Sequence, residues 1–164
     1  MQLTHTHHTP ASHNKEIIIV CDHVSGPANA GSIFRLADAF GVQEIIFCGN
    51  APDVTSSRLR KTARNTERTV RFRESENIAT TLINLREEGF STIALEIDST
   101  SIPIAEVHIA NMSKISLVIG AESTGVTPEA LEQCAVIAHI PMHGINSSMN
   151  VAQAAGIALY ELTR

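Results

Sequence analysis

The chain has 164 residues, of which 43% are hydrophobic, and a formal net charge of −5. This length and composition fit one globular domain with its own core. The sequence has no apolar run long enough to span a membrane, and its N-terminus lacks the apolar core of a signal peptide. We therefore predict a cytoplasmic protein with no membrane partner.

Residues 1–14 are predicted to form a flexible tail, and residues 15–164 a single domain. The tail holds His5, His7, His8 and His13. Metal binding by these histidines is an alternative, but no Cys or Asp stands nearby at metal-ligand spacing, so we predict no metal site. Elsewhere Cys21, Cys48 and Cys134 lie in or beside apolar segments, which predicts reduced, buried thiols.

The first half of the chain alternates strands and helices. Residues 16–20 are a continuous apolar run and are predicted to form a buried strand. Residues 29–40 have helical apolar spacing, with Asn29 as the expected N-cap and Gly41 as the expected C′ residue. A strand (44–48), a polar helix (55–64) and a short strand (69–72) should follow.

The second half continues the same alternation. A helix at 76–88, closed by Gly89, should precede strands at 91–96 and 115–119. Thr127 and Pro128 are the expected cap and first residue of a helix that continues to residue 134. The last two predicted elements are a strand at 136–140 and a helix at 150–162.

This alternation predicts an α/β fold with a mostly parallel sheet and helices on both faces. Ligands bind such sheets beyond the carboxyl ends of the strands. The loops expected there are 21–29, 97–101, 120–125 and 141–148. They hold many of the chain's Gly, Asn, Ser and Pro residues, so we expect a binding site among them.

One basic segment stands out against the negative net charge. Seven of the 12 Lys and Arg residues lie between residues 58 and 73, and they are Arg58, Arg60, Lys61, Arg64, Arg68, Arg71 and Arg73. A basic face on an acidic protein is compatible with docking of a phosphate backbone. A solvated helix face followed by an edge strand explains the pattern equally well. The scarcity of aromatic residues argues against a base-stacking surface.

Two common site types are disfavoured. Gly120 and Gly125 have the spacing of a phosphate-binding loop, but Val126 and Thr127 stand where that loop needs Lys followed by Ser or Thr. The sequence also lacks the G-x-S-x-G motif of a serine hydrolase. Nucleoside triphosphate hydrolysis and serine-based hydrolysis are therefore not expected.

Several polar residues have both a functional and a structural interpretation. Arg35 is the one cation in its predicted helix; if buried, it needs an anion, and a salt bridge to Asp38 or Asp22 is the structural alternative. Glu122 either rigidifies its loop or is an exposed turn residue. Ser148 or Asn150 could serve only to cap the last helix.

Three segments together resemble the motifs of the SpoU/TrmH branch of the SPOUT RNA methyltransferases. The first motif matches Asn29, Gly31, Arg35 and Phe40-Gly41, and the second matches residues 117–119 with Gly120, Glu122 and Gly125. The third matches Ile140-Pro141-Met142 and Ser148-Met149-Asn150-Val151, with Met149 replacing the usual Leu. The resemblance covers about residues 16–162.

The resemblance implies a C-terminal deep trefoil knot that binds S-adenosylmethionine, and a homodimer. Six residues besides Ser148 are expected to form the cofactor cleft: Leu95, Glu96, Gly120, Ile140, Met142 and Met149. The expected catalytic residues are Arg35, Asn29, Glu122, Ser148 and Asn150. The added RNA-binding domain of many relatives is not seen, so RNA should dock on the core domain, through Arg58, Arg60, Lys61, Arg64 and Arg68.

The implied activity is methyl transfer from S-adenosylmethionine to a ribose 2′-oxygen of RNA. Transfer RNA is the preferred substrate on this interpretation. Ribosomal RNA is one alternative, and a non-catalytic RNA-binding or assembly factor that keeps the knot is another. Arg35 is expected to hold a phosphate and stabilise negative charge on the 2′-oxygen, because an arginine seldom gives up its proton.

Overall fold

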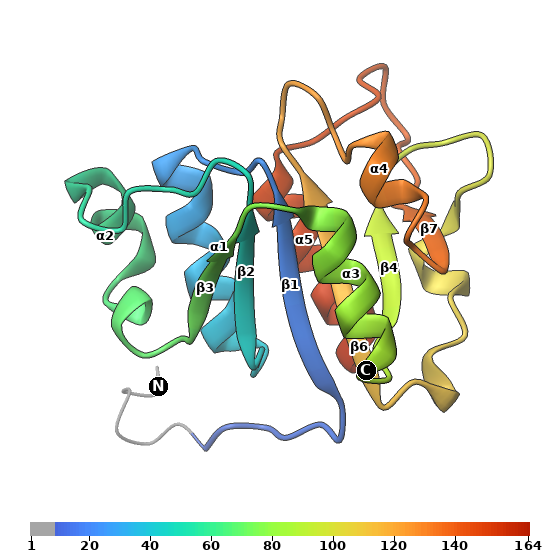
Figure 1. The fold of residues 1–164 in the computed structure, drawn as a ribbon, viewed down its shortest axis with the longest axis horizontal. Coiled ribbons are helices and arrows are strands. Elements are labelled where there is room, and N and C mark those ends of the chain that lie inside the picture. The colour runs from blue at the N-terminus through green and yellow to red at the C-terminus, as the bar shows by residue number, and fades with distance from the viewer. Residues whose placement is uncertain (1–8) are drawn as a thin grey trace.

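The computed structural model describes residues 9–164, so His5, His7 and His8 lie outside the described residues. Its centre is a sheet of seven strands in the order β3-β2-β1-β6-β4-β7-β5 (Figure 1). All six strand pairs are parallel, as predicted. The strands are β1 (Glu16–Asp22), β2 (Glu44–Cys48), β3 (Phe72–Ser75), β4 (Ser91–Leu95), β5 (Ile102–Pro103), β6 (Lys114–Gly120) and β7 (Val136–His139).

Helices cover both faces of the sheet, which confirms the predicted α/β class (Figure 1). Helices α1 (Pro27–Ala39) and α5 (Val151–Thr163) pack on one face, and α2 (Ser57–Ala63) packs on the outside of α1. Helices α3 (Ile78–Glu87) and α4 (Pro128–Leu131) cover the other face. Short 3₁₀ turns lie at Thr66–Arg68 (η2), Ile104–Glu106 (η3) and Ile109–Asn111 (η4).

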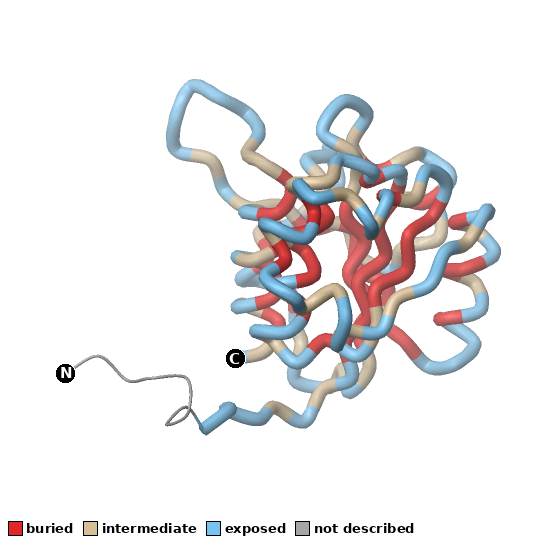
Figure 2. The backbone as a smooth tube through the Cα atoms, turned by 90° about the vertical axis from the view of Figure 1, so that its left-hand side faces the viewer, coloured by how far each residue is buried: buried red, intermediate tan, exposed pale blue. Residues whose placement is uncertain are grey.

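Strands β1 and β6 are buried along almost their whole length, and Figure 2 shows that the buried residues gather in the interior of the molecule. Alternate side chains of β1 therefore enter different cores: Ile17 and Ile19 face α1 and α5, whereas Ile18 and Val20 face α3 and α4. Continuous apolar runs are typical of strands in such a position. This is why the apolar runs in the sequence predicted the strands well.

Several predicted helix ends are confirmed. Gly41 and Gly89 have φ of +62° and +91°, which glycine adopts at low cost just after a helix. The Thr127 side chain accepts a hydrogen bond from the backbone of Ala130 and caps α4. Asn29, however, is not the N-cap of α1: the helix begins at Pro27 after Gly26, because proline is well suited to the first helical position.

Other element boundaries differ from the prediction. Strand β3 begins at Phe72 rather than at residue 69, since Thr69 and Val70 remain hydrogen-bonded to Thr66 at the end of η2. Helix α4 is only four residues long and ends well before residue 134. The two-residue edge strand β5 was not expected, and it carries Pro103, which is tolerated at a sheet edge.

Two predictions about chain organisation remain open. The knot stays a prediction; the parallel sheet and the long loop between β7 and α5 are consistent with it (Figure 1). The division at residue 14 also stays a prediction, although His13 Nε2 lies 2.8 Å from the Phe40 carbonyl oxygen. Within residues 9–164, no helix is long and apolar enough to cross a membrane.

Candidate active site

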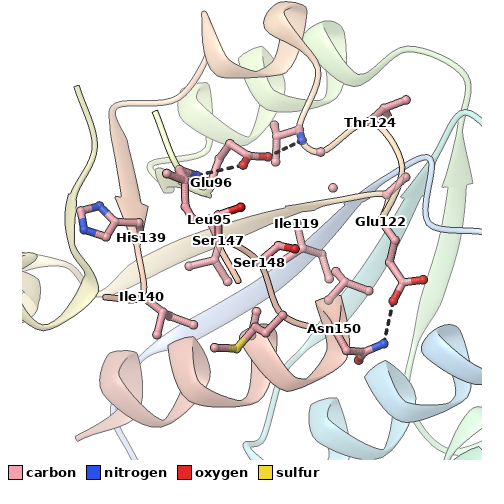
Figure 3. A pocket seen from close by; sticks show the side chains of 18 of the residues that line it. Leu95, Glu96, Ile119, Glu122, Thr124, His139, Ile140, Ser147, Ser148 and Asn150 are labelled. Atoms are coloured by element: carbon pink, nitrogen blue, oxygen red, sulfur yellow. Dashed lines mark hydrogen bonds between the residues drawn. The ribbon is translucent and has the colours of Figure 1, made fainter. Parts of the chain in front are cut away.

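A pocket of about 590 Å³ lies at the carboxyl ends of β4, β6 and β7 (Figure 3). Its walls come from the loops after these strands and from the start of α5. Every residue that the sequence predicted for a cofactor cleft lines it: Leu95, Glu96, Gly120, Ile140, Met142, Ser148 and Met149. The volume suits a small organic molecule such as a nucleoside derivative.

The pocket combines apolar walls with a polar rim. Ile119, Met149 and Val151 are among the apolar residues that line it, and Glu122 and Asn150 stand at the polar side. Polar and apolar atoms contribute about equally to the lining, so the pocket suits a ligand that has both charged and uncharged parts.

Asn150 connects the loop after β6 with the first turn of α1 at the polar side of the pocket. Its Nδ2 donates to Glu122 Oε1 at 2.7 Å (Figure 3) and to Asn29 Oδ1 at 2.8 Å. Its Oδ1 accepts from the backbone N–H groups of Ala152 and Gln153 and so caps α5. The capping and functional interpretations of Asn150 therefore both fit, because different atoms of one amide serve them. Glu122 is exposed, and its side chain accepts a hydrogen bond from Asn150 rather than from its own loop.

The loop before α5 is open to solvent. Residues 143–148 are all exposed, including Ser148, whose hydroxyl makes no hydrogen bond within residues 9–164. Ser148 is therefore not the helix cap. Nearby, the Ser101 hydroxyl lies 2.9 Å from His139 Nδ1 and connects the 98–101 turn to the end of β7.

The loop after β6 folds back tightly on its own strand. A Cβ atom on Gly120 would overlap the backbone of Gly125 and Val126. Gly125 itself has φ of +66°, and its N–H donates to the Ala121 carbonyl at 2.8 Å. The glycine pair thus permits a close backbone approach that any larger residue would prevent.

Two carboxylates hold this loop, a role the sequence analysis did not predict. Asp22 is fully buried; its Oδ2 accepts from the Thr127 N–H at 2.7 Å, and its Oδ1 pairs with His23 Nδ1 at 2.8 Å. Glu96 Oε2 accepts from the Val126 N–H at 2.8 Å, and Oε1 accepts from Ile97. The available signal was Asp22 itself, a charged residue that directly follows the apolar run of β1.

Arg35 lies outside the pocket and is exposed on α1. The buried or half-buried environment considered for it is wrong, because Ile33, Phe34 and Ala37 occupy the core-facing positions of the helix. The alternative of a salt bridge to Asp38 or Asp22 is also not observed within the described chain. Within one chain, Arg35 is thus free to meet a ligand or a partner.

The basic residues divide into two groups. Arg71 and Arg73 lie 3.9 and 3.3 Å from the carboxylate of Glu44, and Arg68 lies 3.8 Å from Glu67. The other four, which we call the α2 basic surface, are exposed and form no salt bridge with another described residue: Arg58, Arg60, Lys61 and Arg64.

Helix α2 is held against α1 at Gly31. A Cβ atom there would stand 2.5 Å from the Leu59 carbonyl oxygen and 2.9 Å from Thr62 Cβ. Gly31 and Arg35 are four residues apart and therefore share a side of α1. The close approach fixes the α2 basic surface relative to the helix that carries Arg35.

The thiols are not candidates for a reactive site. All three cysteines are free, and burial raises the pKa of Cys48 to about 11 and that of Cys134 to about 12. Burial also raises the pKa of Cys21 well above its ordinary value. A protonated, buried thiol is a poor nucleophile and a poor metal ligand. Residues 9–164 hold no group of three or more His, Cys, Asp or Glu side chains arranged to bind a metal.

Comparison with known proteins extends these observations. Residues 16–160 match the SpoU rRNA Methylase family. The 23S rRNA (guanosine-2′-O-)-methyltransferase RlmB of Acinetobacter baylyi is 30% identical over 154 residues, which are 93% of this chain and 61% of that protein. The chain thus spans about three fifths of the length of such curated relatives.

Solved structures agree with this match. The A. aeolicus TrmH/SpoU tRNA modifying enzyme superposes with a TM-score of 0.81 at 27% identity, over 92% of this chain and 76% of its own. The AdoMet-bound rRNA methyltransferase of Sinorhizobium meliloti gives a TM-score of 0.82 at 25% identity, over 92% and 57%. With a family match over nearly the whole chain and this fold, the protein belongs to the SpoU rRNA methylase family.

Proposed function

We propose that this protein transfers a methyl group from S-adenosylmethionine to a ribose 2′-oxygen of RNA. The observation that carries the proposal is the pocket at the ends of β4, β6 and β7, which gathers all seven residues predicted for the cofactor. A similar protein from S. meliloti is described as binding AdoMet. S-adenosylmethionine would supply an electrophilic methyl group: the ribose oxygen would bond to the methyl carbon as the carbon–sulfur bond breaks, S-adenosylhomocysteine would leave, and the proton of the hydroxyl would pass to solvent.

The residues of the pocket fit such a cofactor. The apolar side chains of Leu95, Ile140 and Met149 would exclude water and hold its uncharged parts. Glu122, bonded to Asn150, places a carboxylate at the rim where a sulfonium charge would be stabilised. Holding donor and acceptor in line would supply much of the rate enhancement.

Arg35 would act on the RNA rather than on the cofactor. Its guanidinium would hold a phosphate and stabilise the charge that develops on the 2′-oxygen, because arginine stays protonated. Asn29 stands beside the pocket of its own chain through its bond to Asn150. Arg35 does not line that pocket, so we assign it to the pocket of a partner subunit.

A homodimer would bury an apolar face formed by α1 and α5. Ile157 and Tyr160 of α5 are 41% and 64% exposed, and the half-buried Leu36 of α1 lies beside Gly156. Large exposed apolar side chains on adjacent helices favour association with another protein surface. We propose that a second copy covers this face and brings its own Arg35 to the pocket.

Ribosomal RNA is now the favoured substrate, in place of the transfer RNA preferred from sequence. The relatives of Acinetobacter baylyi and Nitrosomonas europaea, at 30% and 32% identity, are both 23S rRNA (guanosine-2′-O-)-methyltransferases. Transfer RNA remains the second candidate, because the A. aeolicus neighbour is a tRNA modifying enzyme. An RNA substrate agrees with a cytoplasmic location, which stays a prediction.

The test measures cofactor binding and product together. Calorimetry should show binding of S-adenosylmethionine, and methyl transfer should label 23S rRNA with a 2′-O-methylated nucleoside seen by mass spectrometry. Labelling of tRNA alone would show that transfer RNA, and not ribosomal RNA, is the substrate. A protein that binds RNA but no S-adenosylmethionine would be a non-catalytic factor, and the proposal would fail.

A further inference from the structure

We propose that Asp22 and Glu96 are positioning residues that fix the loop after β6, and that neither acts as a direct cofactor ligand. This inference rests on the proposed function, because the loop forms one wall of the candidate cofactor pocket. It changes the role predicted for Glu96 from sequence, which was contact with the cofactor.

The sheet order places an acid on each side of the loop. Strand β6 lies between β1 and β4; a carboxylate is the last residue of β1, and another directly follows β4. Asp22 is the last residue of β1 and pairs in register with Gly120. Glu96 directly follows Leu95, which pairs with Ile119. The chain leaving β6 therefore passes between two carboxylates from different strands.

The two carboxylates accept hydrogen bonds from consecutive backbone amides. Glu96 Oε2 takes the Val126 N–H at 2.8 Å, and Asp22 Oδ2 takes the Thr127 N–H at 2.7 Å. Such short bonds to ionised acceptors are stronger than bonds between neutral groups. Because the amides are adjacent, the two bonds fix both the position and the direction of the backbone where α4 begins.

The remaining oxygens are also used within the protein. Asp22 Oδ1 pairs with His23 Nδ1, and Glu96 Oε1 accepts from the Ile97 N–H at 2.9 Å. Figure 3 shows the Glu96 carboxylate turned toward the loop backbone. A Cβ atom on Gly125 would overlap Glu96 Oε2, so the glycine leaves room for the carboxylate. Glu96 is therefore committed to the loop.

The position of this loop matters for the pocket. It carries Gly120 and Glu122, which line the cavity, and Glu122 must lie close enough to meet Asn150 at 2.7 Å. Releasing Val126 would let the loop move away from the end of β6. Glu96 thus acts on cofactor affinity through the loop, without touching the cofactor.

The decisive variant is Glu96→Gln, since Glu96 is only partly buried and glutamine keeps its size. The amide has one oxygen and one NH₂, so it can accept only one of the two N–H bonds. In the free protein, hydrogen exchange at the Val126 amide, followed by NMR, should accelerate about tenfold or more. S-adenosylhomocysteine should bind about tenfold more weakly in calorimetry. Glu129→Gln, an exposed carboxylate on α4 outside the pocket, should change neither value.

Each other result overturns the inference. If Glu96→Gln binds S-adenosylhomocysteine more weakly while exchange at the Val126 amide is unchanged, Glu96 is a direct ligand. If exchange is faster while binding is unchanged, Glu96 stabilises the loop without affecting the pocket. In the variant Asp22→Asn, hydrogen exchange at the Thr127 amide should accelerate in the same way, which gives a second measurement of the loop. If the wild-type protein binds no S-adenosylhomocysteine, the proposed function fails, while the exchange measurement still tests whether the carboxylates hold the loop.

Discussion

The pocket region and the α1–α2 region differ in how complete they are within one chain. Around the pocket, three loops meet and their polar groups pair with one another, as Asn150 does with Glu122 and Asn29. On α1 and α2, Arg35 and the α2 basic surface point to solvent and pair with no other described residue. A single chain therefore forms the candidate pocket by itself, whereas Arg35 and the α2 basic surface are left accessible to a ligand or a partner from outside the chain.

The largest expected effect comes from removing Arg35, the cation that we propose a partner subunit brings to the pocket. Arg35→Ala should lower kcat for RNA methylation by about 100- to 1000-fold, the loss typical of one charge-stabilising donor. The dissociation constant for S-adenosylmethionine should stay unchanged in calorimetry, because Arg35 does not line the pocket. Arg86→Ala, at an exposed position of α3 outside the pocket, is the matched control.

Mixed dimers sharpen this test. Arg35→Ala keeps an intact pocket and Asn150→Ala keeps an intact Arg35, so a hybrid dimer would contain one complete site if Arg35 serves the partner subunit. Mixing the two inactive variants should then restore about a quarter of wild-type activity, as random pairing predicts. No recovery would place Arg35 at the pocket of its own chain or remove it from the reaction.

The next effect concerns the junction between α1 and α2. Gly31→Ala should lower the free energy of unfolding by about 1–3 kcal/mol, the usual cost of overpacking. The added Cβ has only backbone of Leu59 and Ala63 and the Thr62 side chain as neighbours. Gly156→Ala is the control: its Cβ would stand 3.2 Å from the tip of Leu36, which can move aside. Equal denaturation midpoints for both variants would show that the junction tolerates a side chain.

A smaller effect is expected from the α2 basic surface. Changing Arg60→Gln, Lys61→Gln and Arg64→Asn together should weaken RNA binding about tenfold and reduce the steepness of its salt dependence. Asn is chosen at position 64 because the residue has φ of +57°. Arg71→Gln with Arg73→Gln removes charge that already lies near Glu44. If both sets weaken binding equally, the α2 surface has no special role.

The smallest effect tests whether the two regions share one stability. Cys21 lies in the core that α1 and α5 cover, whereas Cys48 and Cys134 lie in the core that α3 and α4 cover. Burial raises the pKa of Cys48 to about 11 and that of Cys134 to about 12, above the ordinary 9.0. The unfolded chain therefore loses these protons first, and the free energy of unfolding should fall as the pH rises from about 9 toward 12.

Thiol-reagent kinetics in mild denaturant would complete that comparison. Cys21 and Cys134, which lie in the cores on opposite faces of the sheet, should become reactive together if the molecule unfolds as one unit. Earlier exposure of one of them would show that its region opens separately.

Strands and several helix ends could be predicted because their causes are local. The apolar run of β1 and the pairing of Thr127 with Pro128 depend on neighbours in the sequence. The predicted start of α1 was wrong for a reason that is also local, because Pro27 is a stronger signal for the first helical position than Asn29 is for an N-cap. Strand β5 could not be found, since two residues with a proline carry no pattern.

The site was predictable only in part. The order of the three motifs predicted which loops form the site, and all residues predicted to bind the cofactor line one pocket. The bonds of Asp22 and Glu96 could not be predicted, because they depend on strand order, which brings β1 and β4 to opposite sides of β6. The exposure of Arg35 could have been read from its helix, whose core-facing side is occupied by Ile33, Phe34 and Ala37.

The double use of the Asn150 amide has a consequence for synthesis of the protein on the ribosome. The same side chain begins α5 and ties the pocket loops together. A nascent chain that has not yet released α5 from the exit tunnel therefore cannot assemble the cavity, however well its earlier strands have paired. The pocket can therefore form only after α5 has become available to fold against the strands that precede it.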